Sequence, residues 1–250
     1  MLPLSGIAVL VTRPLLQAGR LISGIERLGG HAVAYPVIEI ADILDDAKLK
    51  SIMGRLSEYD LAIFVSANAV EKAMEKIRIW PDGLKCAAVG RATLAALQSR
   101  GIDDVILPEH RFDSEGLLES PELEAVEGKK IVIFRGEGGR ERLAEELKKR
   151  GAKVDYAECY RRIVPDARFQ HEEAEIQALT ATSGESVRNL CEMAKDCGWI
   201  FGKPIFVTHE RIGEVARNAG FSRVMVTEMG DEGLLEGLVK WFEVGEGGHG

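Results

Sequence analysis

Small polar residues and arginines directly follow short apolar segments at several points of this chain, and they are the residues best suited to chemistry. Each apolar segment is typical of a buried strand, and each polar group precedes the start of a helix. A helix N-terminus offers free N–H groups and partial positive charge, and arginine offers paired donors, so such groups bind carboxylates or phosphates. The candidate binding residues are Thr12, Arg13, Ser66, Ala67, Asn68, Gly90, Arg91, Thr93, Arg135, Gly136, Arg140, Ser183, Gly184, Ser186, Thr208 and His209. Helix capping alone is the alternative role for the Ser, Thr and Asn residues among them.

Tyr160 is the candidate catalytic side chain. It lies in an extended segment, residues 156–164, and its counterpart in an internal repeat is Glu39, so the repeat does not explain its presence. As a neutral hydrogen-bond donor at pH 7, its phenol could act on a ligand bound beside this segment. Packing alone is the alternative role.

Other kinds of catalytic site lack their residue patterns in this chain. The five histidines form no HxxxH pair, and Cys191 and Cys197 lack zinc-finger spacing. The glycine-rich segment 136–139 falls short of the dinucleotide motif GxGxxG, and neither a GxSxG elbow nor a P-loop occurs. The sequence therefore predicts no metal and no cofactor, and chemistry done by shape and electrostatics.

The elements that position these residues alternate between short apolar segments and amphipathic helices. This rhythm predicts an α/β fold with doubly wound parallel sheets. Ala18, Leu21 and Ile25, for example, recur at helical spacing before the pair of glycines that ends this helix. The predicted strands, each expected to be buried on both faces, are residues 7–11, 61–65, 86–89, 104–107, 131–134, 178–182, 205–207 and 223–226.

The chain contains a long internal repeat. The sequence EGLLE at residues 115–119 returns at 232–236, residues 9–13 resemble 131–135, and residues 65–70 resemble 182–187. A repeat of this length indicates a duplicated domain rather than a solenoid. Two similar domains joined by a two-strand linker would form a cleft, which is where we expect a ligand.

The linkers are predicted at the two extended segments that interrupt the rhythm. A tandem division near residue 125 is one possibility. The other combines residues 1–36 and 165–246 into domain 1 and leaves residues 41–157 as a continuous domain 2, with linker strands at 37–40 and 158–164. The Gly-rich tail, residues 247–250, is predicted to be disordered.

Composition narrows the class of protein and its partners. The chain has 250 residues, 46% hydrophobic and 29% charged, with a net charge of −8, which disfavours nucleic acid and anionic membranes as partners. Its longest apolar runs fall well short of a membrane-spanning helix. Four scattered cysteines without a CxxC pair, and no export signal at the start of the chain, predict a cytoplasmic protein with reduced thiols.

Several of these motifs, in this order, resemble the uroporphyrinogen-III synthase family over essentially the whole chain. They include Thr12-Arg13-Pro14, the segment 64–70 around Ser66, and Gly90-Arg91-Ala92-Thr93. Further along follow Arg135-Gly136, Tyr160-Arg161-Arg162, the segment 182–187 around Ser183, and residues 207–212 around His209. The chain departs from the family pattern at Gly184, where many members have proline, and at Arg211, where many have threonine.

The resemblance implies the discontinuous division and an enzyme that acts without a cofactor. Such enzymes take hydroxymethylbilane, a linear tetrapyrrole polycarboxylate, expel its terminal hydroxyl as water and close the ring with its last pyrrole inverted. The resemblance also implies that the tyrosine matching Tyr160 assists departure of the hydroxyl. It further implies substrate binding between the domains, largely through backbone amides near Ser66, Thr93 and Ser183.

Two other function classes stay open at this point. A non-catalytic two-lobed module that binds a small anionic metabolite would use the same loops, and product formation would distinguish it. A nucleotide-sugar transferase is disfavoured by the weak diphosphate motif. A monomer is expected, with a transient contact to the preceding pathway enzyme as a possibility.

Overall fold

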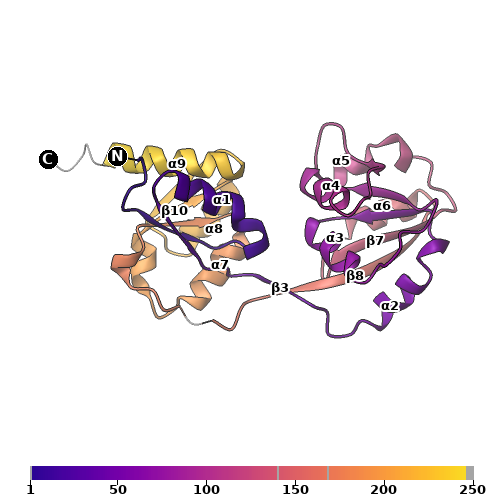
Figure 1. Cartoon of the computed structure of the whole chain (residues 1–250), viewed down its shortest axis with the longest axis horizontal. Helices are drawn as coiled ribbons and strands as arrows, with labels where there is room; N and C mark the ends of the chain where they lie inside the picture. Colours follow the sequence, from indigo (N-terminus) through magenta and orange to yellow (C-terminus); the bar gives the residue numbers. More distant parts are fainter. Residues whose placement is uncertain (1, 140, 168, 246–250) are drawn as a thin grey trace. The chain divides into compact units, whose positions relative to one another are not determined.

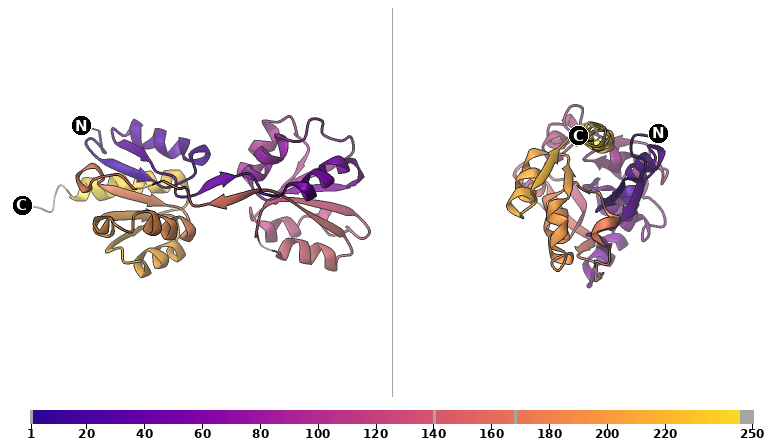
Figure 2. Two further views of the ribbon diagram at one scale, coloured as in Figure 1. Left: turned by 90° about the horizontal axis from the view of Figure 1, so that it is seen from below. Right: turned by 90° about the vertical axis from the view of Figure 1, so that its left-hand side faces the viewer.

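The computed structural model describes residues 2–139, 141–167 and 169–245 of the chain. The chain divides into two compact units, unit 1 being Met1–Glu39 with Ile163–Gly250 and unit 2 being Ile40–Arg162. Unit 1 is therefore built from both ends of the chain, and Figure 2 shows the indigo N-terminal segment folded together with the orange and yellow C-terminal segment. Arg140 and the predicted disordered tail lie outside the described residues.

Unit 1 contains a five-stranded sheet with the order β11-β10-β9-β1-β2. Adjacent strands pair in parallel throughout. The strands are β1 (Ala8–Val11), β2 (His31–Ala34), β9 (Ala178–Ala181), β10 (Pro204–Val207) and β11 (Arg223–Val226). The helices are α1 (Leu15–Arg27), α7 (Gly184–Met193), α8 (Glu210–Asn218) and α9 (Gly230–Gly245), with 3-10 turns at Glu173–Glu175 and Gly198–Gly202.

The core of unit 1 forms because apolar positions of strands and helices face one another. Leu21 and Ile25 of α1 and Leu234 of α9 pack in one cluster with Val9 and Val11 of β1. Helices α1 and α9 lie side by side on this face, as Figure 1 shows, while α7 and α8 contact each other. The helical spacing predicted for α1 is thus confirmed.

Unit 2 contains a six-stranded sheet with the order β3-β8-β7-β4-β5-β6. The pairs from β8 to β6 are parallel. The strands are β3 (Glu39–Ala41), β4 (Leu61–Phe64), β5 (Lys85–Ala88), β6 (Val105–Ile106), β7 (Lys130–Gly136) and β8 (Lys153–Ile163). The helices are α2 (Ala47–Gly54), α3 (Ala67–Met74), α4 (Arg91–Gln98), α5 (Ser114–Leu118) and α6 (Arg142–Lys149), with 3-10 turns at Leu56–Glu58 and Pro121–Leu123.

Alternating residues of the central strands supply two cores in unit 2. Phe64 and Phe134 stack with ring centroids 4.5 Å apart, in a cluster that includes residues of α2, α3 and α4. Their neighbours Ile63 and Ile133 belong to the opposite cluster, with residues of α5 and α6. This alternation covers both faces of the sheet, which is why β4 and β7 are almost wholly buried.

The predicted α/β fold with parallel sheets is confirmed, but burial was predicted wrongly for two strands. β6 and β11 lie at the edges of their sheets and are only partly buried. An edge strand has a neighbour on one side alone, so solvent reaches side chains that a central strand would bury. The predicted linker segments contribute to β3 and β8, which are neighbours in the sheet of unit 2.

Strands that correspond in the repeat lie in the same spatial order in the two sheets, although the chain runs through them in a different sequence. The order of the strands along the chain reverses between β1 and β9 in unit 1 and between β4 and β7 in unit 2. Ligands of open α/β sheets bind at such switch points, beyond the carboxyl ends of the strands. Among the helices that the described residues form, none combines the length and the apolar character that crossing a membrane requires.

Candidate functional site

The switch point of unit 2 brings together the ends of β4, β7 and β8. The backbone N–H of Val65, just after β4, donates to the carbonyl of Phe134 in β7 at 3.2 Å. The N–H of Glu137, just after β7, donates to the carbonyl of Tyr160 in β8 at 2.8 Å. The first bond holds the loop after β4 against β7, and the second holds the loop after β7 against β8.

A register shift in β8 sets the direction of the Tyr160 side chain. Arg135 pairs with Glu158, but the next residue of β7, Gly136, pairs with Tyr160, so β8 carries one extra residue at Cys159. Cys159 and Tyr160 consequently pack in the same core cluster, although neighbouring strand residues normally point to opposite faces. Bulges of this kind redirect side chains and are frequent beside active sites.

The hydroxyl of Tyr160 meets the N-terminus of α3. Its oxygen lies 3.1 Å from the Ser66 Oγ, and that Oγ accepts a hydrogen bond from the Ala69 N–H at 3.1 Å. Ser66 is the N-cap of α3, so its position is fixed by the helix. Tyr160 is only 2% exposed. The phenol is therefore held in one place and largely shielded from water.

Gly136 gives the Tyr160 ring its space. A Cβ atom at residue 136 would lie 2.7 Å from Cε2 and 2.8 Å from Cζ of the tyrosine ring. These distances are shorter than atoms tolerate, so any larger residue would displace the ring. Gly136 is thus a structural requirement for this tyrosine orientation.

A pocket of about 360 Å³ opens beside Tyr160. Its size falls within the usual range for ligand pockets. The residues around it come from β7, β8, the loops after β4 and β7, α5 and α6. They are Val65, Ser114, Ile133, Arg135, Gly136, Glu137, Gly139, Leu143, Tyr156, Tyr160 and Arg162.

Arg135, Tyr156 and Glu141 form a connected charged group at this pocket. The Arg135 guanidinium is buried and lies 4.5 Å from the centroid of the Tyr156 ring. Both Arg135, at 3.3 Å, and the Tyr156 hydroxyl, at 2.8 Å, donate to the Glu141 carboxylate. Burial and the bond to Glu141 raise the pKa of Tyr156 to about 12. The Tyr156 hydroxyl and Arg135 lower the pKa of Glu141, so this group holds its carboxylate ionised.

The other predicted residues of unit 2 lie at the ends of β4 and β5. Ala67 and the largely buried Asn68 form the first turn of α3, and Gly90 precedes α4 as its N-cap. Thr93 is buried in α4. Arg91 is exposed, with its guanidinium 4.4 Å from the centroid of the Phe112 ring.

In unit 1, the predicted residues near β1 are engaged with their own unit. Thr12 is wholly buried and its hydroxyl donates to the Thr180 carbonyl at 2.8 Å. Arg13 forms an ion pair with Asp231 at the start of α9. Neither side chain is presented to a ligand in this arrangement.

The remaining predicted residues of unit 1 lie at helix starts. Ser183 caps α7 by accepting from the Ser186 N–H at 2.9 Å, and Gly184 is the first residue of that helix. His209 caps α8, where its Nδ1 accepts from the Arg211 N–H at 3.1 Å, and Thr208 precedes it. Capping, the alternative role stated for such residues, is thus observed at Ser66 and Ser183, and at His209.

Five polar residues at or beside this pocket are not among the candidates predicted from the sequence, namely Ser114, Glu137, Glu141, Tyr156 and Arg162. Two signals could have found some of them. Tyr156 and Arg162 flank Tyr160 in the same extended segment, and Ser114 stands just before the repeated EGLLE motif. Glu141 gave no comparable signal. No group of three or more potential metal ligands occurs among the residues that the structure describes.

Comparisons with known proteins agree on one family. The family model described as uroporphyrinogen-III synthase HemD matches residues 19–236. The chain is similar to the uroporphyrinogen-III synthase of Salmonella typhimurium strain LT2, with 32% identity over 241 residues covering 91% of this chain and 98% of that protein. The Escherichia coli K12 protein of the same name is 31% identical over 240 residues, with the same coverage.

Solved structures agree with this at the level of the fold. The crystal structure of uroporphyrinogen-III synthetase from Helicobacter pylori 26695 matches with a TM-score of 0.62 and 12% identity, covering 94% of this chain and 99% of that one. A mutant uroporphyrinogen III synthase from the extremely thermophilic bacterium Thermus thermophilus matches with a TM-score of 0.57 and 16% identity, covering 98% of this chain and 100% of that one.

Proposed function

Because the chain belongs to the uroporphyrinogen-III synthase family, we propose that it closes hydroxymethylbilane to uroporphyrinogen III at the strand ends of unit 2, with Tyr160 as its catalytic residue. The chain is an enzyme of porphyrin biosynthesis, a lyase that acts on a small tetrapyrrole. The observation that carries the assignment of the site is the Tyr160 hydroxyl, fixed beside a pocket at the switch point by Ser66.

The reaction breaks the bond between a pyrrole-bound carbon and its hydroxyl. The hydroxyl takes up a proton and leaves as water, and ring closure releases a proton from the pyrrole that forms the new bond, so no net proton is consumed. Since the adjacent pyrrole stabilises the resulting cation, this loss is easy, and the free bilane closes to the uninverted isomer without help. The enzyme must therefore hold the reactive chain so that closure with inversion of ring D is favoured. In this proposal Tyr160 donates a hydrogen bond to the departing hydroxyl, and Ser66 orients the phenol.

The surroundings of Tyr160 suit this role. The phenol is almost completely buried, and a hydrogen bond to a departing oxygen is stronger in a site from which water is excluded. Ser66 is the N-cap of α3, and the partial positive charge of this helix N-terminus favours negative charge that develops on the departing oxygen nearby. When substrate binds, the Tyr160 hydroxyl would either leave Ser66 to bond to the substrate or donate to the substrate while still accepting from Ser66.

Backbone amides near Ser66, Thr93 and Ser183 are proposed to bind the carboxylates of the substrate, since each residue lies at the start of a helix. We further propose that the protein works in the cytoplasm as a monomer. The support for this compartment is that its four cysteines, all within the described residues, are free thiols. Because the substrate closes spontaneously, a transient contact with the enzyme that supplies it would limit that loss.

An isomer assay tests the proposed function. Hydroxymethylbilane is generated in situ, the protein is added, and the products are oxidised to porphyrins and separated. Dominant isomer III supports the synthase assignment. Isomer I alone, from folded protein and active substrate, would refute it and would favour a non-catalytic binding module for an anionic metabolite.

A further inference from the structure

The two units place an arginine at the same point of their sheets. In unit 1, Val11 of β1 pairs with Thr180 of β9, and Arg13 follows two residues later. In unit 2, Ile133 of β7 pairs with Ile63 of β4, and Arg135 follows two residues later. Since Ser183 and Ser66 each lie three residues beyond those partners and cap the next helix, the registers agree and the two arginines are equivalent.

The helix starts that face these arginines are also equivalent. Gly233 of α9 and Gly116 of α5 occupy the same place in the repeated EGLLE sequence. A Cβ atom at Gly233 would meet the carbonyl of Glu228, and one at Gly116 would meet that of Arg111, in each case a residue five positions earlier. The same close turn therefore precedes both helices.

By this equivalence, Asp231 of unit 1 corresponds to Ser114 of unit 2, because each stands two residues before its glycine. In unit 1 the Asp231 carboxylate lies against Arg13 as an ion pair. In unit 2 the corresponding residue carries only a hydroxyl, and both Ser114 and Arg135 line the 360 Å³ pocket. The pocket thus lies where unit 1 places a carboxylate of its own.

We propose that the unit 2 pocket binds a carboxylate group of the ligand against Arg135, in the position that the Asp231 side chain takes against Arg13 in unit 1. The proposal rests on the proposed function for the identity of the ligand, whose acetate and propionate side chains are carboxylates. One of these carboxylates would lie next to Arg135 and Ser114.

The chemistry of the pocket wall fits a carboxylate. The Tyr156 ring supports the guanidinium plane of Arg135 from one side, and Gly139 allows close approach because a Cβ there would lie 2.7 Å from the Arg135 Nη2. Arg162 adds a second positive charge to the lining, which also includes Glu137. Arg135 and Tyr156 already donate hydrogen bonds to the Glu141 carboxylate, so their geometry suits a carboxylate, and that of the ligand would bind beside Glu141 or in its place.

Variants of Ser114 test the proposal through steady-state kinetics. Ser114→Asp gives unit 2 the carboxylate that unit 1 has, whereas Ser114→Asn has similar size and no charge. We expect KM for hydroxymethylbilane to be about tenfold higher in Ser114→Asp than in Ser114→Asn, because a fixed carboxylate competes for Arg135 and repels that of the substrate. Gln98→Glu adds the same charge at an exposed position of α4 outside the pocket and is expected to keep the wild-type KM. Equal KM values for the two Ser114 variants would overturn the proposal.

A second readout needs no turnover. Propionate is titrated into the protein while the Nε–H resonance of Arg135, assigned by its loss in Arg135→Lys, is followed by NMR. We expect a saturable shift in the wild type and in Ser114→Asn, and a reduced shift in Ser114→Asp. No shift in the wild type would overturn the carboxylate site. Formation of isomer I alone in the assay above would refute the proposed function and leave this site to be decided by the propionate titration.

Discussion

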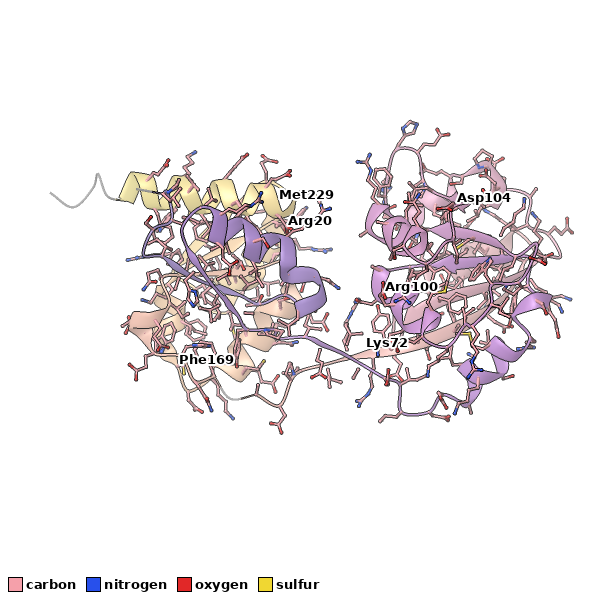
Figure 3. All side chains as sticks on the ribbon, viewed as in Figure 1. Arg20, Lys72, Arg100, Asp104, Phe169 and Met229 are labelled. Carbon is pink, nitrogen blue, oxygen red and sulfur yellow. The ribbon has the colours of Figure 1, made fainter. Side chains whose placement is uncertain are left out.

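Equivalent strands lie in the same spatial order in unit 1 and unit 2, yet one strand differs at the end of the sheet where ligands bind. β2 of unit 1 has 4 residues, whereas its counterpart β8 of unit 2 has 11 and carries a register shift before Tyr160. In unit 1, Tyr35 packs edge-on against Phe169, labelled in Figure 3, with ring centroids 4.9 Å apart. In unit 2, Tyr156 of β8, whose position in the strand register corresponds to Ala34 of β2, lines the pocket. Duplication supplied two sets of strand ends, and extension of a single strand distinguishes the one to which we assign the chemistry.

The charged residues at the two switch points also differ between the units. Unit 1 neutralises its strand-end arginine with Asp231 from its own helix. Unit 2 has Ser114 at that place and a pocket beside it, and its arginine, Arg135, pairs instead with Glu141, the N-cap residue of α6. Each unit thus pairs its arginine with a carboxylate of its own, but from a different element, and in unit 2 the position equivalent to Asp231 carries no charge.

The largest expected effect comes from filling the space that unit 2 keeps for the Tyr160 ring. Gly136→Ala places a Cβ 2.7 Å from Cε2, so the phenol must move away from Ser66. We expect turnover to fall about a hundredfold, since displacements near 1 Å at a reacting group have effects of that order. The rate of isomer III formation measures it. Gly54→Ala, where no atom lies within 4 Å of the added Cβ, is the matched control, and an equal loss there would contradict this explanation.

Removing the Tyr160 hydroxyl should have the next largest effect. We expect Tyr160→Phe to slow turnover about tenfold without unfolding the protein, because only the hydrogen bond to the departing hydroxyl is lost. Tyr59→Phe is its control, since the Tyr59 hydroxyl donates to Asp155 at 2.6 Å in the same unit. That variant should lose about 1 kcal/mol of unfolding free energy and keep its turnover. Unchanged turnover in Tyr160→Phe would remove this residue from the mechanism.

The two N-cap serines offer a direct test of the difference between units. Ser66→Ala and Ser183→Ala each remove the cap of an equivalent helix, so each should cost about 1 kcal/mol of unfolding free energy. Only Ser66 also contacts the Tyr160 hydroxyl, so turnover should fall several-fold more in Ser66→Ala. Denaturant unfolding and initial rates separate the two effects. Equal rates for both variants would show that Ser66 does not orient the phenol.

The smallest expected effect concerns the reactivity of the cysteine thiols, which should differ between the two units. Burial raises the pKa of Cys86 and of Cys159, both in unit 2, to about 12, whereas Cys191 and Cys197 of unit 1 are partly exposed. Because the thiolate is the reactive form, a disulfide reagent at pH 8 should label only the unit 1 cysteines of the folded protein. Rapid labelling of all four would contradict the packing of unit 2.

The same shifts fix the direction of the alkaline pH dependence. The folded pKa values of these two thiols lie above the ordinary thiol value of 9.0, so their contribution to stability is present below pH 9. It is lost as the pH rises toward 12, and the unfolding free energy should decline over that range.

Most of the fold could be predicted from the sequence, because buried parallel strands are continuous apolar runs and the repeat fixes their correspondence. The edge positions of β6 and β11 could not be predicted, since an apolar segment does not reveal how many neighbouring strands it will have. Tyr160 could be selected from its place outside the repeat. Its orientation could not, because the extra residue at Cys159 leaves no mark in the residue pattern.

Contacts between distant residues also escaped the sequence. The bond between Ser66 and Tyr160 joins residues 94 apart, and the pairing of Arg13 with Asp231 spans 218 residues. Periodicity reports the face on which a residue lies, whereas these contacts depend on which strand ends meet. The repeat contained the relevant signal for Asp231 and Ser114, but its meaning required the register of both sheets.

The product isomer ratio, measured in parallel for the wild type and for Tyr160→Phe, shows whether the Tyr160 hydroxyl takes part in ring closure. We expect mainly isomer III from the wild type. In Tyr160→Phe we expect a larger share of isomer I, because spontaneous closure overtakes the slowed reaction. An unchanged ratio and rate in Tyr160→Phe, or isomer I alone from the folded wild-type protein, would contradict the role of Tyr160 or the synthase activity, respectively.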